Sequence, residues 1–263
     1  GNIQGYDLTM DGKWVATGGK DNVVSLWDME NKSKHKQLNL GNDVGMVKFQ
    51  MDGSRLFVVE MTGLIPIHWS SYTVPDLKKE YEGTLPLEDT RSVAFAPNGK
   101  HLVYSRDNND VILVRLSDGK VTPLGGHGNY IPGLKFSPDS QIIVSMCADN
   151  FIRVFDVSTG KEKYKRRYGN LWGSQIVFSN NGKLFVCFTQ IGKARTTPVA
   201  YETKTGRELF RLKHGNGVCD VFFSPDGKFV YTGSRDFSAK KWNLNDVLQN
   251  AVTKPVTTFL LGD

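Results

Sequence analysis

Two groups of side chains in this sequence have the types from which a hydrolytic site is built. Each group contains a histidine, a hydroxyl residue 18 positions later and an aspartate 4 positions after that. The groups are His127, Ser145 and Asp149, and His214, Thr232 and Asp236. In a catalytic triad the histidine takes a proton from the hydroxyl while the carboxylate orients the ring. A single active site would need one such group, so the duplicated spacing favours a repeated structural part.

Other kinds of catalytic or metal site have little support in the sequence. The five histidines are scattered, and the three cysteines include no Cys-x-x-Cys pair, so no zinc-ligand spacing is present. No glycine-rich, phosphate-binding loop leads into a helix. We therefore expect no catalytic residue, no metal and no cofactor.

The elements that position both groups are marked by a recurring turn. An apolar run ends in Asp-Gly, Asn-Gly or a close relative at six places: Asp11-Gly12, Asp52-Gly53, Asn98-Gly99, Asp139-Ser140, Asn181-Gly182 and Asp226-Gly227. The second residues of successive turns are 41, 46, 41, 42 and 45 positions apart. A period of about 40–45 residues is typical of repeats in which each unit is one small sheet.

Within each repeat, short apolar or alternating runs are separated by turn residues. The last repeat shows this most clearly, with strands expected at 217–223, 228–232 and 237–242 and a fourth at 256–261. A helical pattern is confined to one short segment, 244–251. Four antiparallel strands per unit, with no helices between units, predict a radial arrangement of small sheets.

The predicted fold is all-β, a six-bladed β-propeller with four antiparallel strands in each blade. We expect a single propeller domain over 1–263, with blades at about 1–40, 41–84, 85–126, 127–168, 169–213 and 214–263. Each blade is expected to use four strands of its own. Two alternatives remain open, because the six blades could close without an exchanged strand or belong to a larger propeller.

The fourth and sixth units resemble WD40 repeats. In that family a histidine, a Ser or Thr, an aspartate and a tryptophan form a buried hydrogen-bonded set. The sixth unit matches fully with Trp242 as the fourth member, and the fourth unit has Phe155 in its place. The first unit keeps Thr17, Asp21 and Trp27 at the same spacings. The resemblance implies the propeller fold and a structural network, which rigidifies a unit when every member is paired.

The second, third and fifth units depart from this pattern. They have no well-placed aspartate in the turn after the second strand, where the family has one. The departure puts their internal hydrogen-bonded sets in doubt and leaves the predicted fold unchanged.

One segment, 161–168, is locally basic, with five basic residues, one acid and two tyrosines. Its basic residues are Lys161, Lys163, Lys165, Arg166 and Arg167. On an outer strand, such charge would prevent sheet-to-sheet aggregation. The alternative is a contact for phosphate, anionic lipid or an acidic partner. The remaining charge is spread over both expected faces, so the net charge of +6 predicts no broad basic face.

A partner-binding surface is expected where loops converge at the top of the propeller. The candidate residues are Tyr6, Arg91, Tyr130, Phe151, Trp172 and Phe237. Tyrosine, tryptophan and arginine are the side chains that most often anchor interfaces. The resemblance adds support, since WD40-like propellers commonly bind peptides on this face. Ordinary packing is the alternative for each aromatic residue.

These observations predict a non-catalytic scaffold that binds a protein or peptide partner within a multi-protein complex. Nucleic-acid or anionic-surface binding through the basic segment is one alternative. A propeller that belongs to or accompanies an enzyme is another, because the fold does not fix the function. The small, odd number of cysteines argues against a disulfide framework and fits a reducing compartment, and no apolar run approaches the roughly 20 residues of a membrane span. We expect a cytoplasmic protein, with the nucleus as the alternative.

Overall fold

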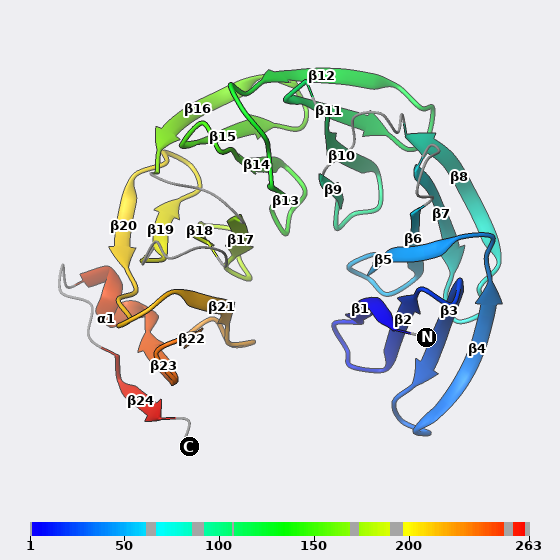
Figure 1. The fold of residues 1–263 in the computed structure, drawn as a ribbon, viewed down its shortest axis with the longest axis horizontal. Helices are drawn as coiled ribbons and strands as arrows, with labels where there is room; N and C mark the ends of the chain where they lie inside the picture. The colour runs from blue at the N-terminus through cyan, green and yellow to red at the C-terminus, as the bar shows by residue number, and fades with distance from the viewer. Residues whose placement is uncertain are drawn as a thin grey trace. The chain divides into compact units, whose positions relative to one another are not determined.

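The computed structural model describes residues 2–61, 67–85, 92–106, 108–168, 174–189, 197–249 and 255–260. Nearly all of the regular structure is strand, arranged in six antiparallel sheets of four strands each. Every sheet is built from four consecutive strands of the chain (Figure 1). This is the predicted fold class, a six-bladed WD40-like β-propeller, and we number its sheets one to six in chain order.

Two compact units make up the chain, and each is described by itself. The first contains Gly1–Asn108 and Ile112–Thr122, and the second contains Asn109–Val111 and Pro123–Asp263. The prediction of one domain over the whole chain stays a prediction.

The first three sheets contain twelve strands. Sheet one is β1 (Ile3–Leu8), β2 (Trp14–Gly19), β3 (Val23–Asp28) and β4 (Ser33–Asn39). Sheet two is β5 (Asp43–Phe49), β6 (Arg55–Met61), β7 (Ile67–Thr73) and β8 (Lys79–Leu85). Sheet three is β9 (Ser92–Phe95), β10 (His101–Ser105), β11 (Asp110–Arg115) and β12 (Val121–Gly126).

The last three sheets contain twelve strands and a short helix. Sheet four is β13 (Gly133–Phe136), β14 (Ile142–Met146), β15 (Phe151–Asp156) and β16 (Glu162–Arg167). Sheet five is β17 (Ser174–Phe178), β18 (Leu184–Thr189), β19 (Val199–Glu202) and β20 (Glu208–Arg211). Sheet six is β21 (Val218–Phe223), β22 (Phe229–Ser234), β23 (Ser238–Asn243) and β24 (Thr257–Leu260), with α1 (Leu244–Gln249) before its last strand.

The recurring turn joins the first and second strands of every sheet. Its second residue has a positive φ in all six turns, between 62° at Ser140 and 72° at Gly12 and Gly53. Glycine adopts this region without steric cost, which explains why five of the six residues are glycine. In the last turn the Gly227 amide donates to Ser224 O over 2.8 Å, and the Asp226 side chain accepts from the Lys228 amide over 3.0 Å.

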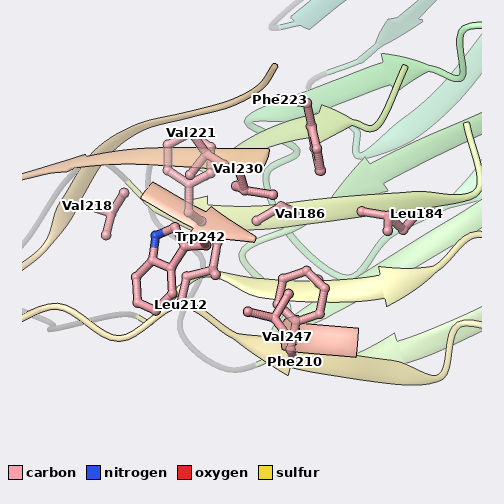
Figure 2. Packing of buried hydrophobic residues seen from close by; sticks show 12 residues of the cluster. Leu184, Val186, Phe210, Leu212, Val218, Val221, Phe223, Val230, Trp242 and Val247 are labelled. Carbon is pink, nitrogen blue, oxygen red and sulfur yellow. The ribbon is translucent and has the colours of Figure 1, made fainter. Parts of the chain in front are cut away.

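Apolar side chains of successive sheets pack together within each unit. In the first unit, Val24 and Leu26 of sheet one lie in a cluster with Val47 and Phe49 of sheet two. In the second unit, Figure 2 shows the cluster around Trp242, which joins sheets five and six. Alternation along each strand sends side chains to both faces, so sheets two and five each contribute to two clusters.

Candidate functional site

Sheet six holds a hydrogen-bonded chain of four side chains. Trp242 Nε1 donates to Thr232 Oγ1 over 2.9 Å, and Thr232 Oγ1 lies 2.7 Å from His214 Nε2. On the other side of the ring, His214 Nδ1 lies 3.1 Å from Asp236 Oδ2. Thr232 and Trp242 lie on the neighbouring strands β22 and β23, and Asp236 lies in the turn between them. This hairpin therefore brings Thr232, Asp236 and Trp242 together, and His214 reaches them from the link between β20 and β21.

The partners of His214 determine its protonation. A carboxylate only accepts, so Nδ1 carries the proton toward Asp236 and Nε2 accepts from the Thr232 hydroxyl. Burial lowers the pKa of His214. Burial also opposes ionisation of Asp236, but hydrogen bonds from Ser238 and the Gly215 amide outweigh it and hold its pKa well below the ordinary value. Thr232 is 1% exposed, which fits a structural role better than a nucleophilic one.

Sheet four contains the same residue types with an arginine inserted among them. His127 Nε2 lies 2.6 Å from Ser145 Oγ. Arg153 Nη1 contacts His127 Nδ1 and donates to Asp149 Oδ2 over 2.9 Å. A guanidinium only donates, so His127 Nδ1 accepts and Nε2 carries the proton that Ser145 accepts. This tautomer is the reverse of the one in sheet six.

The fourth sheet also contains the one group of potential metal ligands among the described residues. Ligand atoms of His127, Cys147 and Asp149 all lie within 4.8 Å of one another. Burial and the nearby Arg153 lower the pKa of His127 to about 4. Burial raises the pKa of the Cys147 thiol to about 12, which disfavours the thiolate that a metal binds. The Arg153 guanidinium already places a positive charge there, so the group is poorly suited to a cation.

The aromatic member of the set differs among the sheets. In sheet one, Trp27 Nε1 donates to Thr17 Oγ1 over 3.1 Å, and Asp21 lies in the following turn between β2 and β3. In sheet four, Phe155 is 1% exposed and has no N–H group to donate. The tryptophan hydrogen bond is therefore present in sheets one and six, and packing alone fills the position in sheet four.

In four sheets, the turn between the second and third strands has a left-handed residue at one position. Asn22, Asn109 and Asn150 have φ values of 61°, 68° and 70°, and Phe237 has 61° at the equivalent place in sheet six. Asparagine visits this region because its short side chain bonds locally, whereas a bulky residue there is an outlier. Phe237 is also 74% exposed. This predicted partner-binding residue thus combines an unfavourable backbone with a ring in solvent.

The other predicted partner-binding residues occupy varied surroundings. Tyr130 is 37% exposed, and Tyr6 is 78% exposed on β1. The Phe151 ring lies 5.6 Å from Lys165 Nζ, so the structure brings it together with the basic segment. The two remaining candidates, Arg91 and Trp172, lie outside the described residues.

The basic segment forms β16 and uses part of its charge within the protein. The Arg166 guanidinium donates to Thr205 O over 2.8 Å and to Gly206 O over 3.1 Å, which ties β16 to the turn between β19 and β20. Lys163 Nζ lies 3.8 Å from Asp156 Oδ2. Lys161 and Arg167 are exposed. Two of the five basic side chains therefore have partners in the protein that compete with a phosphate.

Sequence reasoning missed the roles of Arg153 and Arg166. Arg153 pairs directly across the β14–β15 hairpin with Ser145, so the register of that hairpin contained a signal for its place beside His127. Arg166 reaches carbonyl groups about 40 residues later in the chain. No spacing in the sequence indicates that contact.

Comparison with known families agrees with this architecture. The sequence profile of the WD domain, G-beta repeat, matches residues 5–28 and 206–243. The profile of the anaphase-promoting complex subunit 4 WD40 domain matches residues 93–181. Both profiles describe WD40 repeats, and together they cover more than half of the chain. No helix among the described residues is long and apolar enough to cross a membrane.

Several known proteins are similar to this chain over much of its length. Transcription factor unc-37 of Caenorhabditis elegans is 25% identical over 90% of this chain and 37% of its own length. The target of rapamycin complex subunit LST8 of Mus musculus is 23% identical over 60% of this chain and 50% of its own. Eukaryotic translation initiation factor 3 subunit I of Danio rerio is 25% identical over 90% of this chain and 78% of its own. The chain thus spans about a third to a half of the length of unc-37 and LST8. LST8 and the translation initiation factor subunit are named as subunits of larger assemblies. The chain belongs to the WD40-repeat family, as its repeat length, its six four-stranded sheets and both profile matches establish.

Proposed function

We propose that this chain is a non-catalytic interaction module that binds a protein or peptide through the turn between β22 and β23, with Phe237 as its anchor. The observation that carries the proposal is the combination of a left-handed φ of 61° and 74% exposure at this phenylalanine. Relatives named as subunits of complexes support an interaction role.

The left-handed backbone at Phe237 costs conformational energy that contacts within the folded chain do not offset. The left-handed region costs an ordinary residue about 1–2 kcal/mol. Burial of the ring would compensate, but the side chain is largely in solvent. The equivalent turns of sheets one, three and four avoid the cost with asparagine. Strained residues of this kind cluster at binding sites, where an aromatic side chain gains its energy from the partner.

Hydrogen bonds to Asp236 fix the turn that contains Phe237. Asp236 accepts from the Gly215 amide over 2.7 Å and from Ser238 Oγ over 2.6 Å. The same carboxylate lies beside His214, whose ring connects to the buried part of the sheet. A rigid turn loses little conformational entropy on binding. The hydrogen-bonded set therefore fits the role of a support for a displayed side chain.

A photo-crosslinking experiment tests the proposal directly. We expect p-benzoylphenylalanine at position 237 to crosslink a discrete partner in an extract of the source cells. The same group at Tyr81, a 48% exposed residue on the outer strand β8, is the matched control. Identical crosslinked products from the two positions would contradict the proposal.

The variant Phe237→Asn separates stability from binding. It installs the residue of the equivalent turns, so we expect the free energy of unfolding to rise by about 1 kcal/mol in urea denaturation. We also expect affinity for the crosslinked partner to fall at least tenfold, measured by calorimetry. A variant that binds as well as the parent chain would refute the anchor role of Phe237. The absence of catalysis and the cytoplasmic location stay predictions.

A further inference from the structure

Within each compact unit, successive sheets cover one another in the same way. One side chain from the second strand of a sheet lies in a cluster with side chains from the first strand of the next sheet. The covered side chains are 0–1% exposed, and they are Ala16, Phe57, Val144 and Val186. The covering side chains are at most 9% exposed, and they are Val47, Phe49, Phe95, Ile176, Phe178, Val221 and Phe223. In this protein, the face of one sheet is thus covered by the first strand of another.

Sheet six carries the covered position without full burial. Tyr231 of β22 lies four residues after the positive-φ residue of its inner turn, Gly227, as each of the four covered side chains does in its own sheet. Tyr231 is only half-buried. Its ring stacks on the Phe222 ring with centroids 5.0 Å apart, and Phe222 is 53% exposed. An aromatic surface is therefore open to solvent at the place where other sheets contact a neighbour.

Sheet one carries the covering positions, and they are exposed. Leu8 of β1 lies four residues before the positive-φ residue of its inner turn, Gly12, and Tyr6 lies six residues before it. Leu8 is 52% exposed and Tyr6 is 78% exposed. In sheets two, five and six, the residues at these two positions are at most 9% exposed. A single exposed apolar residue is ordinary, but exposure of both positions indicates an interaction surface.

We propose that these two surfaces bind each other between copies of this chain, so that sheet one of one copy covers sheet six of the next. The first strand that covers a sheet in the internal contacts has apolar side chains at these positions, and β1 presents Tyr6 and Leu8 there. The contact joins two different surfaces, so it is heterologous. Such contacts link copies head to tail into a closed ring or an open array. The surface of Tyr231 differs from the turn that contains Phe237.

Lys241 makes this contact weaker than those within a unit. It pairs with Tyr231 across β22 and β23, and its Nζ lies 3.8 Å from the centre of the Phe229 ring. The residues at the same place in sheets one, four and five are all 0% exposed, and they are Leu26, Val154 and Ala200. Covering an ammonium group costs free energy of desolvation. The association is therefore reversible and depends on concentration.

Two variants that each block one surface test the proposal. Tyr231→Glu places a carboxylate on sheet six, and Leu8→Glu places one on sheet one, where a covering sheet would remove it from water. By sedimentation velocity, the mass of the parent chain should rise with concentration from one copy to two or more. Each variant alone should associate at least tenfold more weakly. An equimolar mixture should reach the mass of two copies and no more, because each variant keeps the surface that the other has lost.

Controls separate the contact from general effects of the substitutions. Tyr81→Glu makes the same exchange on the outer strand β8 and should associate like the parent chain, and so should Phe237→Asn. Recovery in the mixture shows that both blocked variants are folded. If Leu8→Glu lowers the melting temperature, Tyr6→Glu replaces it, because Tyr6 is the more exposed residue.

Three results would overturn the proposal. The first is a parent chain that keeps the mass of one copy at every concentration, as expected if a sheet of another protein covers these surfaces. The second is a blocked variant that associates alone as strongly as the parent chain, which would show a contact between like surfaces. The third is a mixture of the two folded variants that does not associate.

Discussion

At the scale of single residues, the network in sheet four makes stability depend on pH. Burial and the Arg153 charge hold the pKa of His127 at about 4, against about 6.5 in an unfolded chain. Between these values the unfolded chain binds a proton that the folded chain does not, so stability falls as the pH is lowered. We expect His127 to contribute a loss of about 2 kcal/mol between pH 7.5 and pH 5, measured by urea unfolding.

The control for this prediction is His127→Gln, which cannot titrate in that range. Burial also lowers the pKa values of His101 and His214, so the parent chain loses further stability in the same direction. The depressed pKa of Asp149 adds to the loss only below this range, because its unfolded form is protonated only at lower pH. The pH dependence of the variant should therefore be smaller by about 2 kcal/mol. Equal pH dependence in both proteins would show that the His127 ring is not held neutral by burial.

At the scale of elements, β16 is fixed to the turn between β19 and β20 by a close approach at Gly206. A Cβ atom there would lie 2.3 Å from the Tyr164 ring, and φ is 68°. Gly119 has almost the same φ of 69° in the corresponding turn of sheet three, with nothing within 4 Å of its Cβ position. We expect Gly119→Ala to lower the free energy of unfolding by about 1–2 kcal/mol because of its backbone conformation alone. Gly206→Ala should lower it by a further 1–3 kcal/mol or so because of overpacking.

Thermal and urea unfolding of the two variants measures this difference. The Tyr164 hydroxyl donates to Thr203 O over 2.7 Å, so the ring cannot withdraw without losing that bond. Tyr164→Ala removes the obstacle, and in that background the two alanine substitutions should cost the same. If Gly206→Ala and Gly119→Ala already cost the same in the parent chain, the ring is more mobile than the structure indicates.

The same elements show what the sequence could predict. The inner turns were predictable because a short Asp-Gly or Asn-Gly step requires a positive φ, and all six adopt it. The four-strand units followed from the regular spacing of those turns. The attachment of Arg166 to Thr205 and Gly206 was not predictable, because it depends on how sheets four and five approach each other.

The candidate site was predictable only in part. Thr232 and Asp236 lie four residues apart in the hairpin of β22 and β23, and His214, which precedes β21, contacts both at the spacing that the repeat shares. Spacing does not distinguish sheet four, where Arg153 contacts both the histidine and the aspartate. The positive φ at Phe237 follows from alignment with Asn150, but its exposure depends on the packing around the turn.

At the scale of the whole molecule, the distribution of charge argues for partner binding with little dependence on salt. The net charge of +6 is spread over 263 residues. The most basic strand, β16, has Arg166 bound to backbone carbonyl groups and Lys163 beside Asp156. Each phosphate that a protein neutralises adds about 0.9 to the slope of log affinity against log salt. Few remaining cations on β16 are available for such contacts.

A salt titration with two ligands compares the interaction role with nucleic-acid binding. We expect a 20-base-pair DNA duplex to bind weakly, with a slope no steeper than about −3 because Lys161, Lys165 and Arg167 are the basic residues left in segment 161–168. Binding of the partner crosslinked at Phe237 should change less than about threefold between 50 and 300 mM salt, because the contact of an apolar ring does not release counterions. Replacement of those three residues by glutamine, with Arg166 kept for its structural contacts, should weaken binding of the duplex and leave binding of the partner unchanged. A slope of about −5 or steeper that this variant removes would instead identify β16 as a nucleic-acid-binding strand.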